Sequence, residues 1–198
     1  MKTGGERVRQ GARQFSTKAI GPDLERWEIS PASSGLRFIL RHIVTQDIEG
    51  RFKHWGGELF FDRSKPSLST VRVWVDLRSI DTGSTERDDH VRSAEFFDVG
   101  RFPRAEFESS SIEIGRERVL VRGLLSLHGV QRDVELELSP QAFPTVGRAK
   151  NAYRVRGMID RQSFGLHWNQ DLASGGVVVG DQVELEASVD IVRVDGAR

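Results

Sequence analysis

The chain has 198 residues, and its 29 basic and 29 acidic side chains give a formal net charge of zero. This length suits one domain with a sizeable core, and a neutral chain lacks the basic charge that nucleic-acid binding needs. The absence of cysteine excludes disulfides, thiolate catalysis and cysteine-based zinc sites. No uninterrupted apolar run exceeds three residues, whereas a membrane-spanning helix needs roughly 20.

Residues 1–22 differ from the rest, because five Lys or Arg and one Glu give this segment a net charge of +4. We expect a solvated, disordered basic tail here, followed by one domain over residues 23–198. Contact with an anionic membrane surface is a second interpretation, worth about 1 kcal/mol per basic residue. An Arg-rich organelle transit peptide is a third, which the glycines and the lack of apolar periodicity disfavour. No apolar segment follows the early charges, so we expect no secretory signal and a cytoplasmic location.

From Trp27 onward, apolar and polar residues alternate, as in residues 71–77 and 183–191. Successive side chains of a strand point to opposite faces, so each such segment has one apolar face. Burial of one face is typical of antiparallel sheets, and many short strands favour a barrel or a sandwich. Strands are expected near residues 26–30, 35–45, 50–62, 69–79, 104–114, 117–128, 132–142, 151–160 and 181–193.

One segment breaks this alternation and predicts a short helix over residues 86–94. Thr85 is a suitable N-cap, and the acidic residues that follow it favour the helix dipole. Phe96 and Phe97 come directly after the helix. We expect these two rings to close one end of the barrel core.

The sequence shows no nucleophile elbow, P-loop or dinucleotide fingerprint. The five histidines have no short metal-ligand spacing, so we expect no metal, no cofactor and no catalytic residue. Two polar pairs end apolar strands, Arg41-His42 and Asp160-Arg161. Such groups either orient a ligand head group or make hydrogen bonds and ion pairs at the barrel rim.

A barrel of about eight strands is either filled by its own side chains or holds one small ligand. The inward candidates here are mostly Val and Leu with a few Phe, and Gly157 lies on the same face of its strand. The alternation of apolar and polar residues and the composition do not by themselves distinguish a filled core from a ligand cavity.

Several motifs resemble the YceI-like family of polyisoprenoid-binding, lipocalin-like proteins. The resemblance runs in order from about Trp27 to Val192. Its motifs are Phe38, Arg41-His42, Gly50-Arg51-Phe52, residues 79–83, residues 86–98, Arg101-Phe102-Pro103, Phe107, residues 127–130, Arg132, Asp160-Arg161, residues 164–166, Trp168-Asn169 and residues 179–183. Asp133 departs from the pattern, because the family usually carries Pro there, and many members are exported.

The resemblance implies an all-β, extended antiparallel lipocalin-like barrel that binds a long-chain amphiphilic lipid without converting it. A polyisoprenoid, an isoprenoid quinone or a fatty-acid derivative would suit such an interior, and a homodimer is expected. The expected cavity-lining residues are Phe38, Leu40, Phe60, Val73, Val75, Phe107, Leu125, Val155, Ile159 and Trp168, with Arg41, His42, Asp160 and Arg161 at a head-group end.

Two other classes of function stay open at this stage. One is an enzyme that acts on a lipophilic substrate in the barrel, with His42 or Asp160 as the acid–base group. The other is an interaction module with a filled barrel and an exposed apolar patch. A cavity and the groups that line it would distinguish these classes from a lipid-binding barrel.

Overall fold

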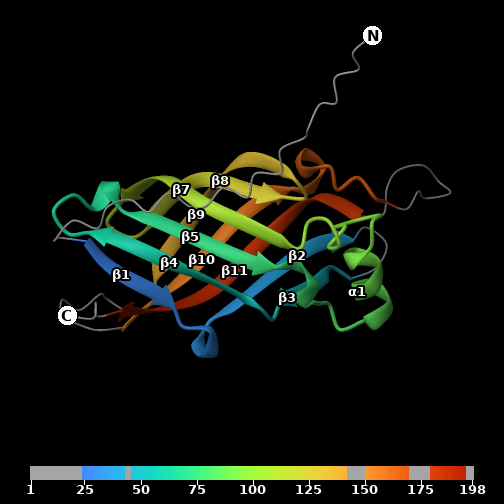
Figure 1. The fold of residues 1–198 in the computed structure, drawn as a ribbon, viewed down its shortest axis with the longest axis horizontal. Helices are drawn as coiled ribbons and strands as arrows, with labels where there is room; N and C mark the ends of the chain where they lie inside the picture. The colour runs from blue at the N-terminus through green and yellow to red at the C-terminus, as the bar shows by residue number, and fades with distance from the viewer. Residues whose placement is uncertain (1–23, 43–45, 142–149, 170–178, 195–198) are drawn as a thin grey trace, which may run out of the picture.

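The computed structural model describes residues 24–42, 46–141, 150–169 and 179–194. Within these ranges the chain forms an antiparallel, closed β-barrel with one helix (Figure 1). The expected tail over residues 1–22 lies outside the described residues. The elements are β1 (Leu24–Ile29), β2 (Gly35–His42), β3 (Ile48–Phe52), β4 (Trp55–Asp62), β5 (Thr70–Asp76), β6 (Ile80–Asp81), α1 (Thr85–Arg92), β7 (Arg104–Ile114), β8 (Val119–Leu127), β9 (Val130–Pro140), β10 (Lys150–Asp160) and β11 (Val179–Val194).

The barrel closes through β11, which pairs with β10 along one edge and with two different strands, β2 and β1, along the other. Its last residues pair with β1, as in Ile29↔Ile191, and so complete the ring β1-β4-β5-β7-β8-β9-β10-β11. Its earlier residues pair with β2, as in Phe38↔Leu185. Strands β2, β3 and β6 therefore extend the sheet beyond the ring, at the end where α1 lies (Figure 1).

The segment expected as one strand over residues 50–62 is two strands, β3 and β4. The chain bends at Lys53 and His54, whose backbone N–H groups donate to the carbonyl and the hydroxyl of Ser79 at 3.1 and 3.0 Å. Ser79 belongs to a 3-10 turn at Leu77–Ser79, so this part of the chain pairs with a turn instead of a strand. The bend directs β3 towards β6, whereas β4 pairs with β1 and β5.

Helix α1 begins and ends slightly before the predicted bounds of 86–94. Its N-cap is Ser84 instead of Thr85, because Ser84 has extended backbone angles and its hydroxyl accepts a hydrogen bond from the N–H of Arg87 at 3.4 Å. The helix stops at Ser93, whose N–H donates to the carbonyls of Asp89 and His90. The helix is therefore a single short element in the connection between β6 and β7.

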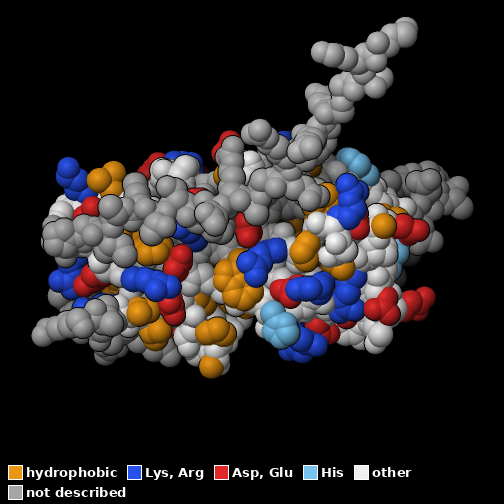
Figure 2. All heavy atoms as spheres, viewed as in Figure 1, with side chains coloured by type: hydrophobic (Ala, Val, Ile, Leu, Met, Phe, Trp, Pro, Cys, Tyr) orange, Lys and Arg blue, Asp and Glu red, His pale blue; other side chains and the backbone are white. Residues whose placement is uncertain are grey.

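The outer face of the barrel carries charges of both signs, interspersed over the surface seen in Figure 2. Several ion pairs join neighbouring strands, such as Arg72 with Glu108 at 3.0 Å and Arg156 with Glu186 at 3.2 Å. Each exposed pair contributes little free energy of folding. Their placement on the outer face agrees with the alternation of polar and apolar residues along the strands.

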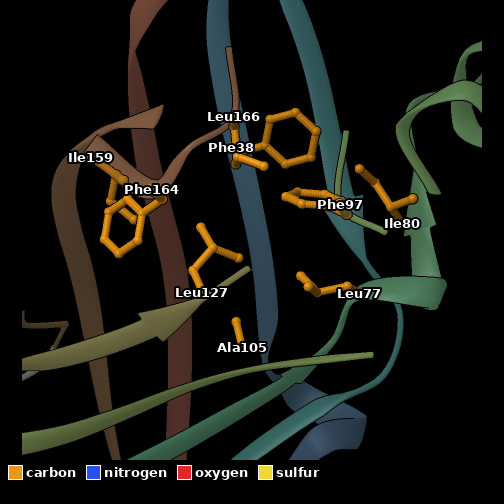
Figure 3. Packing of buried hydrophobic residues seen from close by; sticks show 9 residues of the cluster. All are labelled: Phe38, Leu77, Ile80, Phe97, Ala105, Leu127, Ile159, Phe164 and Leu166. Atoms are coloured by element: carbon orange, nitrogen blue, oxygen red, sulfur yellow. The ribbon is translucent and has the colours of Figure 1, made fainter. Parts of the chain in front are cut away.

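A cluster of nine buried apolar residues forms the core at the α1 end of the barrel (Figure 3). Phe97 belongs to this cluster, and its ring packs edge-on against Phe96 with the centroids 5.1 Å apart. The cluster comprises Phe38, Leu77, Ile80, Phe97, Ala105, Leu127, Ile159, Phe164 and Leu166.

Two phenylalanine rings lie against glycines of a neighbouring strand. A Cβ on Gly123 would stand 2.6 Å from the ring of Phe107 and 2.4 Å from the carbonyl oxygen of Glu108. A Cβ on Gly50 would stand 2.4 Å from the ring of Phe38. Both glycines thus leave room for a ring to lie against the barrel wall.

Replacing Gly123 by alanine is expected to lower the free energy of unfolding by about 1–3 kcal/mol, as overpacking does in other cores. The new methyl group would meet the backbone of Glu108, which cannot rotate away. Gly35→Ala is the control, because nothing lies within 4 Å of a Cβ at that position. Urea unfolding measures both, and equal stabilities for the two variants would contradict this account of Gly123.

Candidate functional site

An apolar cavity of about 360 Å³ lies inside the barrel at the α1 end. Side chains of β2, β5, β8, β10 and β11 form much of its wall, and α1 contributes a further part. Most of the lining side chains are aliphatic or phenylalanine. The polar members of the wall are His42, Thr82, Arg87, His90 and Arg161.

Two smaller cavities continue from this one along the barrel. A cavity of about 130 Å³ shares Val75, Ala105 and Leu125 with the first. A third, of about 190 Å³, shares Val73 and Val155 with the second and has no wall residue in common with the first. The three cavities therefore form a row from the α1 end towards the opposite end, with the smallest in the middle.

Of the fourteen site residues expected from the sequence, eleven line one of these three cavities. They are Phe38, Leu40, His42, Val75, Leu125, Ile159, Arg161 and Trp168 at the α1 end, Val73 and Val155 in the middle and far cavities, and Phe107 in the middle cavity. Phe60, Arg41 and Asp160 line none of them.

Phe60 lies on the outer face of the barrel, contrary to the expectation. Its neighbours Leu59 and Phe61 face the interior and line the far cavity. The guanidinium of Arg72, also on the outer face, lies 5.9 Å from the centroid of the Phe60 ring. Three successive apolar residues hide the alternation here, and only the register with β5, where Trp55 pairs with Val75, fixes which of them point inward.

Arg161 is buried, with 1% of its surface exposed, yet it is not available to a ligand. A guanidinium has five N–H donors, and all five are used within the protein. The acceptors are the carbonyls of Gly180, Leu166, Trp168 and Val179 and the Oδ1 of Asp181, at 2.6 to 3.3 Å. Burial lowers the pKa of Arg161 from its ordinary value, and the charges of Asp181 and Asp160 oppose this shift.

The other three predicted head-group residues have different surroundings. The carboxylate of Asp160 accepts the N–H of Gln162 at 3.0 Å and so caps the 3-10 turn Arg161–Phe164. The side chain of Arg41 is 86% exposed and lies 3.9 Å from Asp47. Of these three, only His42 lines the cavity. Asp160 lines none of the three cavities, so its carboxylate does not face the barrel interior where the sequence analysis placed an acid–base group.

The α1 side of the cavity holds polar groups that the sequence did not single out for the site. The hydroxyl of Thr82 donates to the buried carboxylate of Asp88 at 2.6 Å and accepts from Nε of Arg87 at 2.8 Å. Nη2 of Arg87 donates to the carbonyl of Thr82 at 2.8 Å. The ring of His90 packs edge-on against Trp168, with centroids 4.6 Å apart. The sequence did indicate a charged helix between apolar strands. That pattern does not show which side chains of the helix point towards the barrel interior.

The described residues contain no cluster of three or more His, Asp or Glu side chains suited to a metal ion. None of the helices in those same ranges is long and apolar enough to cross a membrane. The cavity wall thus offers a mainly apolar surface with a polar sector near α1. Such a wall suits a ligand with a long apolar part and a small polar end.

Arg161→Lys is expected to lower the free energy of unfolding by about 3 kcal/mol, because an ammonium cannot reproduce the planar set of donors and leaves buried carbonyls unpaired. The exposed change Arg41→Lys is the control and should stay within about 0.5 kcal/mol of the unmodified protein. Urea unfolding followed by tryptophan fluorescence measures both. A stable Arg161→Lys variant would show that the bonds to the loop after β10 do not support the fold.

Comparisons with known proteins agree on the family. A model of the YceI-like domain matches residues 27–191. Protein YceI of Salmonella newport (strain SL254) is 33% identical over 160 residues, which cover 80% of this chain and 81% of the relative.

Two solved structures share the fold. Burkholderia cenocepacia BcnA has a TM-score of 0.70 at 22% identity, covering 82% of this chain and 98% of its own. A polyisoprenoid-binding domain from Saccharophagus degradans has a TM-score of 0.62 at 18% identity, covering 85% of this chain and 98% of its own. With the family model, the Salmonella relative and the barrel itself in agreement, the chain belongs to the YceI-like family.

Proposed function

We propose that the chain binds one long-chain amphiphilic lipid inside the barrel and does not transform it. The observation that carries this proposal is the row of three apolar cavities along the barrel. A compact ligand would use one of them, whereas an alkyl or polyprenyl chain can thread all three. A polyisoprenoid, an isoprenoid quinone and a fatty-acid derivative all have this shape, and a relative of the same fold is described as polyisoprenoid-binding.

Burial of the chain supplies enough free energy without specific polar contacts. Each buried CH₂ group contributes about 0.8 kcal/mol, so ten buried carbons give roughly 8 kcal/mol before the costs of association and ordering. Aliphatic and phenylalanine side chains form most of the wall that such carbons would contact. Tight binding therefore needs only a few polar contacts at one end.

The two alternative functions fit the described residues less well. An enzyme acting in the barrel would need an acid–base group at the ligand, but Asp160 lies outside the cavities and the donors of Arg161 are all used. His42 is then the remaining residue expected from the sequence for such a role. An interaction module would have a filled barrel, and the 360 Å³ cavity opposes that interpretation.

Organic extraction of the purified protein, followed by mass spectrometry, is expected to release a lipid in about one-to-one ratio. Leu125→Glu should abolish loading, because it places a carboxylate at two of the cavities, where an unpaired charge is costly to bury. Leu124→Glu is the matched control, since Leu124 is 39% exposed on the opposite face of the same strand. Circular dichroism verifies folding of both variants. Equal lipid content in the two variants, or turnover of added lipid that His42→Ala removes, would contradict the proposal.

Ala105→Phe tests whether one chain passes from the first cavity into the second. Ala105 lines both cavities, so a ring at this position should close the passage without adding charge. We expect about tenfold weaker binding of an 18-carbon alcohol, roughly 1.4 kcal/mol, and little change for a 10-carbon alcohol. Ala152→Phe, at a position of β10 that lines no described cavity, is the control. An equal loss for both chain lengths would place the whole ligand in the first cavity.

A further inference from the structure

We propose that the α1 end of the cavity binds an anionic lipid head group, a carboxylate or a phosphate, through Arg87 and His90. This inference rests on the proposed lipid binding and adds the chemical class of the head group and the direction of the chain. Two independent observations carry it: an incompletely paired cation and an unsatisfied buried nitrogen in the same wall.

The first observation is the state of Arg87. Its Nε and Nη2 donate to Thr82, which fixes the guanidinium in place. Its Nη1 has no protein acceptor, and no carboxylate forms an ion pair with it among the described residues. The adjacent carboxylate of Asp88 is turned to Thr82 and lies 3.9 Å from Arg92. Arg87 thus lines an apolar cavity with donors still available.

The second observation is the state of His90. Its Nε2 is buried and is the one buried side-chain nitrogen or oxygen without a hydrogen-bond partner in the described part of the chain. Its Nδ1 lies 3.5 Å from the carboxylate of Glu95, which is 69% exposed. Buried polar atoms in folded proteins almost always have partners. Nε2 is closed off from the cavity in this conformation, so a ligand oxygen must shift the ring to reach it. The oxygen would then supply the missing partner of a protonated ring, whose two nitrogens are both donors.

The two residues are three positions apart on one helix, so their side chains lie on the same face. A guanidinium with available donors recognises carboxylate and phosphate oxygens through short, charge-assisted hydrogen bonds. The low polarity of the cavity wall strengthens the attraction between the guanidinium and an anionic oxygen. Among the described residues, all five donors of Arg161 are used and Arg41 is exposed outside the cavity. Arg87 is therefore the arginine of the described wall with donors available. The chain of the lipid then extends from α1 into the middle and far cavities.

Binding is measured on full-length protein after removal of bound lipid, at pH 6, where a free carboxylate is ionised and a free imidazole is mostly protonated. The probes are oleic acid against oleyl alcohol and geranylgeranyl phosphate against geranylgeraniol, so that each pair differs only in the head group. The unmodified protein should bind the acid of at least one pair about tenfold more tightly than its alcohol. The two pairs distinguish a carboxylate site from a phosphate site.

Arg87→Gln should remove this preference. Arg41→Gln, the same change at an exposed residue outside the cavities, should keep the preference. His90→Phe is the second variant: no hydrogen bond of Nε2 is lost by the substitution, and the preference should fall at least about threefold.

Equal binding of acids and alcohols by the unmodified protein would overturn the head-group assignment while leaving lipid binding intact. A preference that survives both Arg87→Gln and His90→Phe in folded protein would overturn it as well. Failure of the unmodified protein to bind any of the four probes would instead overturn the proposed function, and the head-group assignment with it.

Discussion

The double pairing of β11 is the constraint on which the rest of the structure depends. Residues 191–194 pair with β1 and close the ring, whereas residues 179–188 pair with β2 and carry the sheet beyond it. Closure removes strand edges from the ring itself and creates an enclosed interior. Because β2, β3 and β6 extend past the ring, that interior needs a separate element at one end. The connection that contains α1 supplies it, and it brings Thr82, Arg87 and His90 to a mainly apolar wall.

The barrel encloses free space partly because of how its aromatic residues lie. Phe107 rests against Gly123 and Phe38 against Gly50, in the room that a Cβ would otherwise occupy. A ring that lies along the wall fills less of the axis than one that crosses it. The remaining inward residues are largely Val and Leu, whose side chains do not reach across an eight-stranded barrel in the middle and far cavities. The number of strands sets the diameter of the barrel. The contacts of the two rings with the wall influence how much of the interior stays free of side chains.

Much of the fold could be predicted from the sequence, since alternation over successive strands depends on local geometry alone. The antiparallel sheet and most strand positions followed from that pattern, and a break in it indicated the helix, but β6 was not expected. The break at Lys53 and His54 did not, because it results from hydrogen bonds to Ser79, which lies 25 or more residues along the chain. The direction of Phe60 was also beyond the pattern. Three consecutive apolar residues give no alternation, and pairing with β5 settles which face each takes.

The polar residues show why residue type and position are insufficient to assign a binding role. Arg161 and Arg87 both line the same cavity, and the sequence pointed to the first because it ends an apolar strand. Four carbonyls and one carboxylate use every donor of Arg161, so its charge holds the loop after β10 to the start of β11. Arg87 has fewer partners and sits on an element that only the closed tertiary structure places at the cavity. The number of donors left after folding, which no local pattern encodes, distinguishes a structural arginine from one that can bind a ligand.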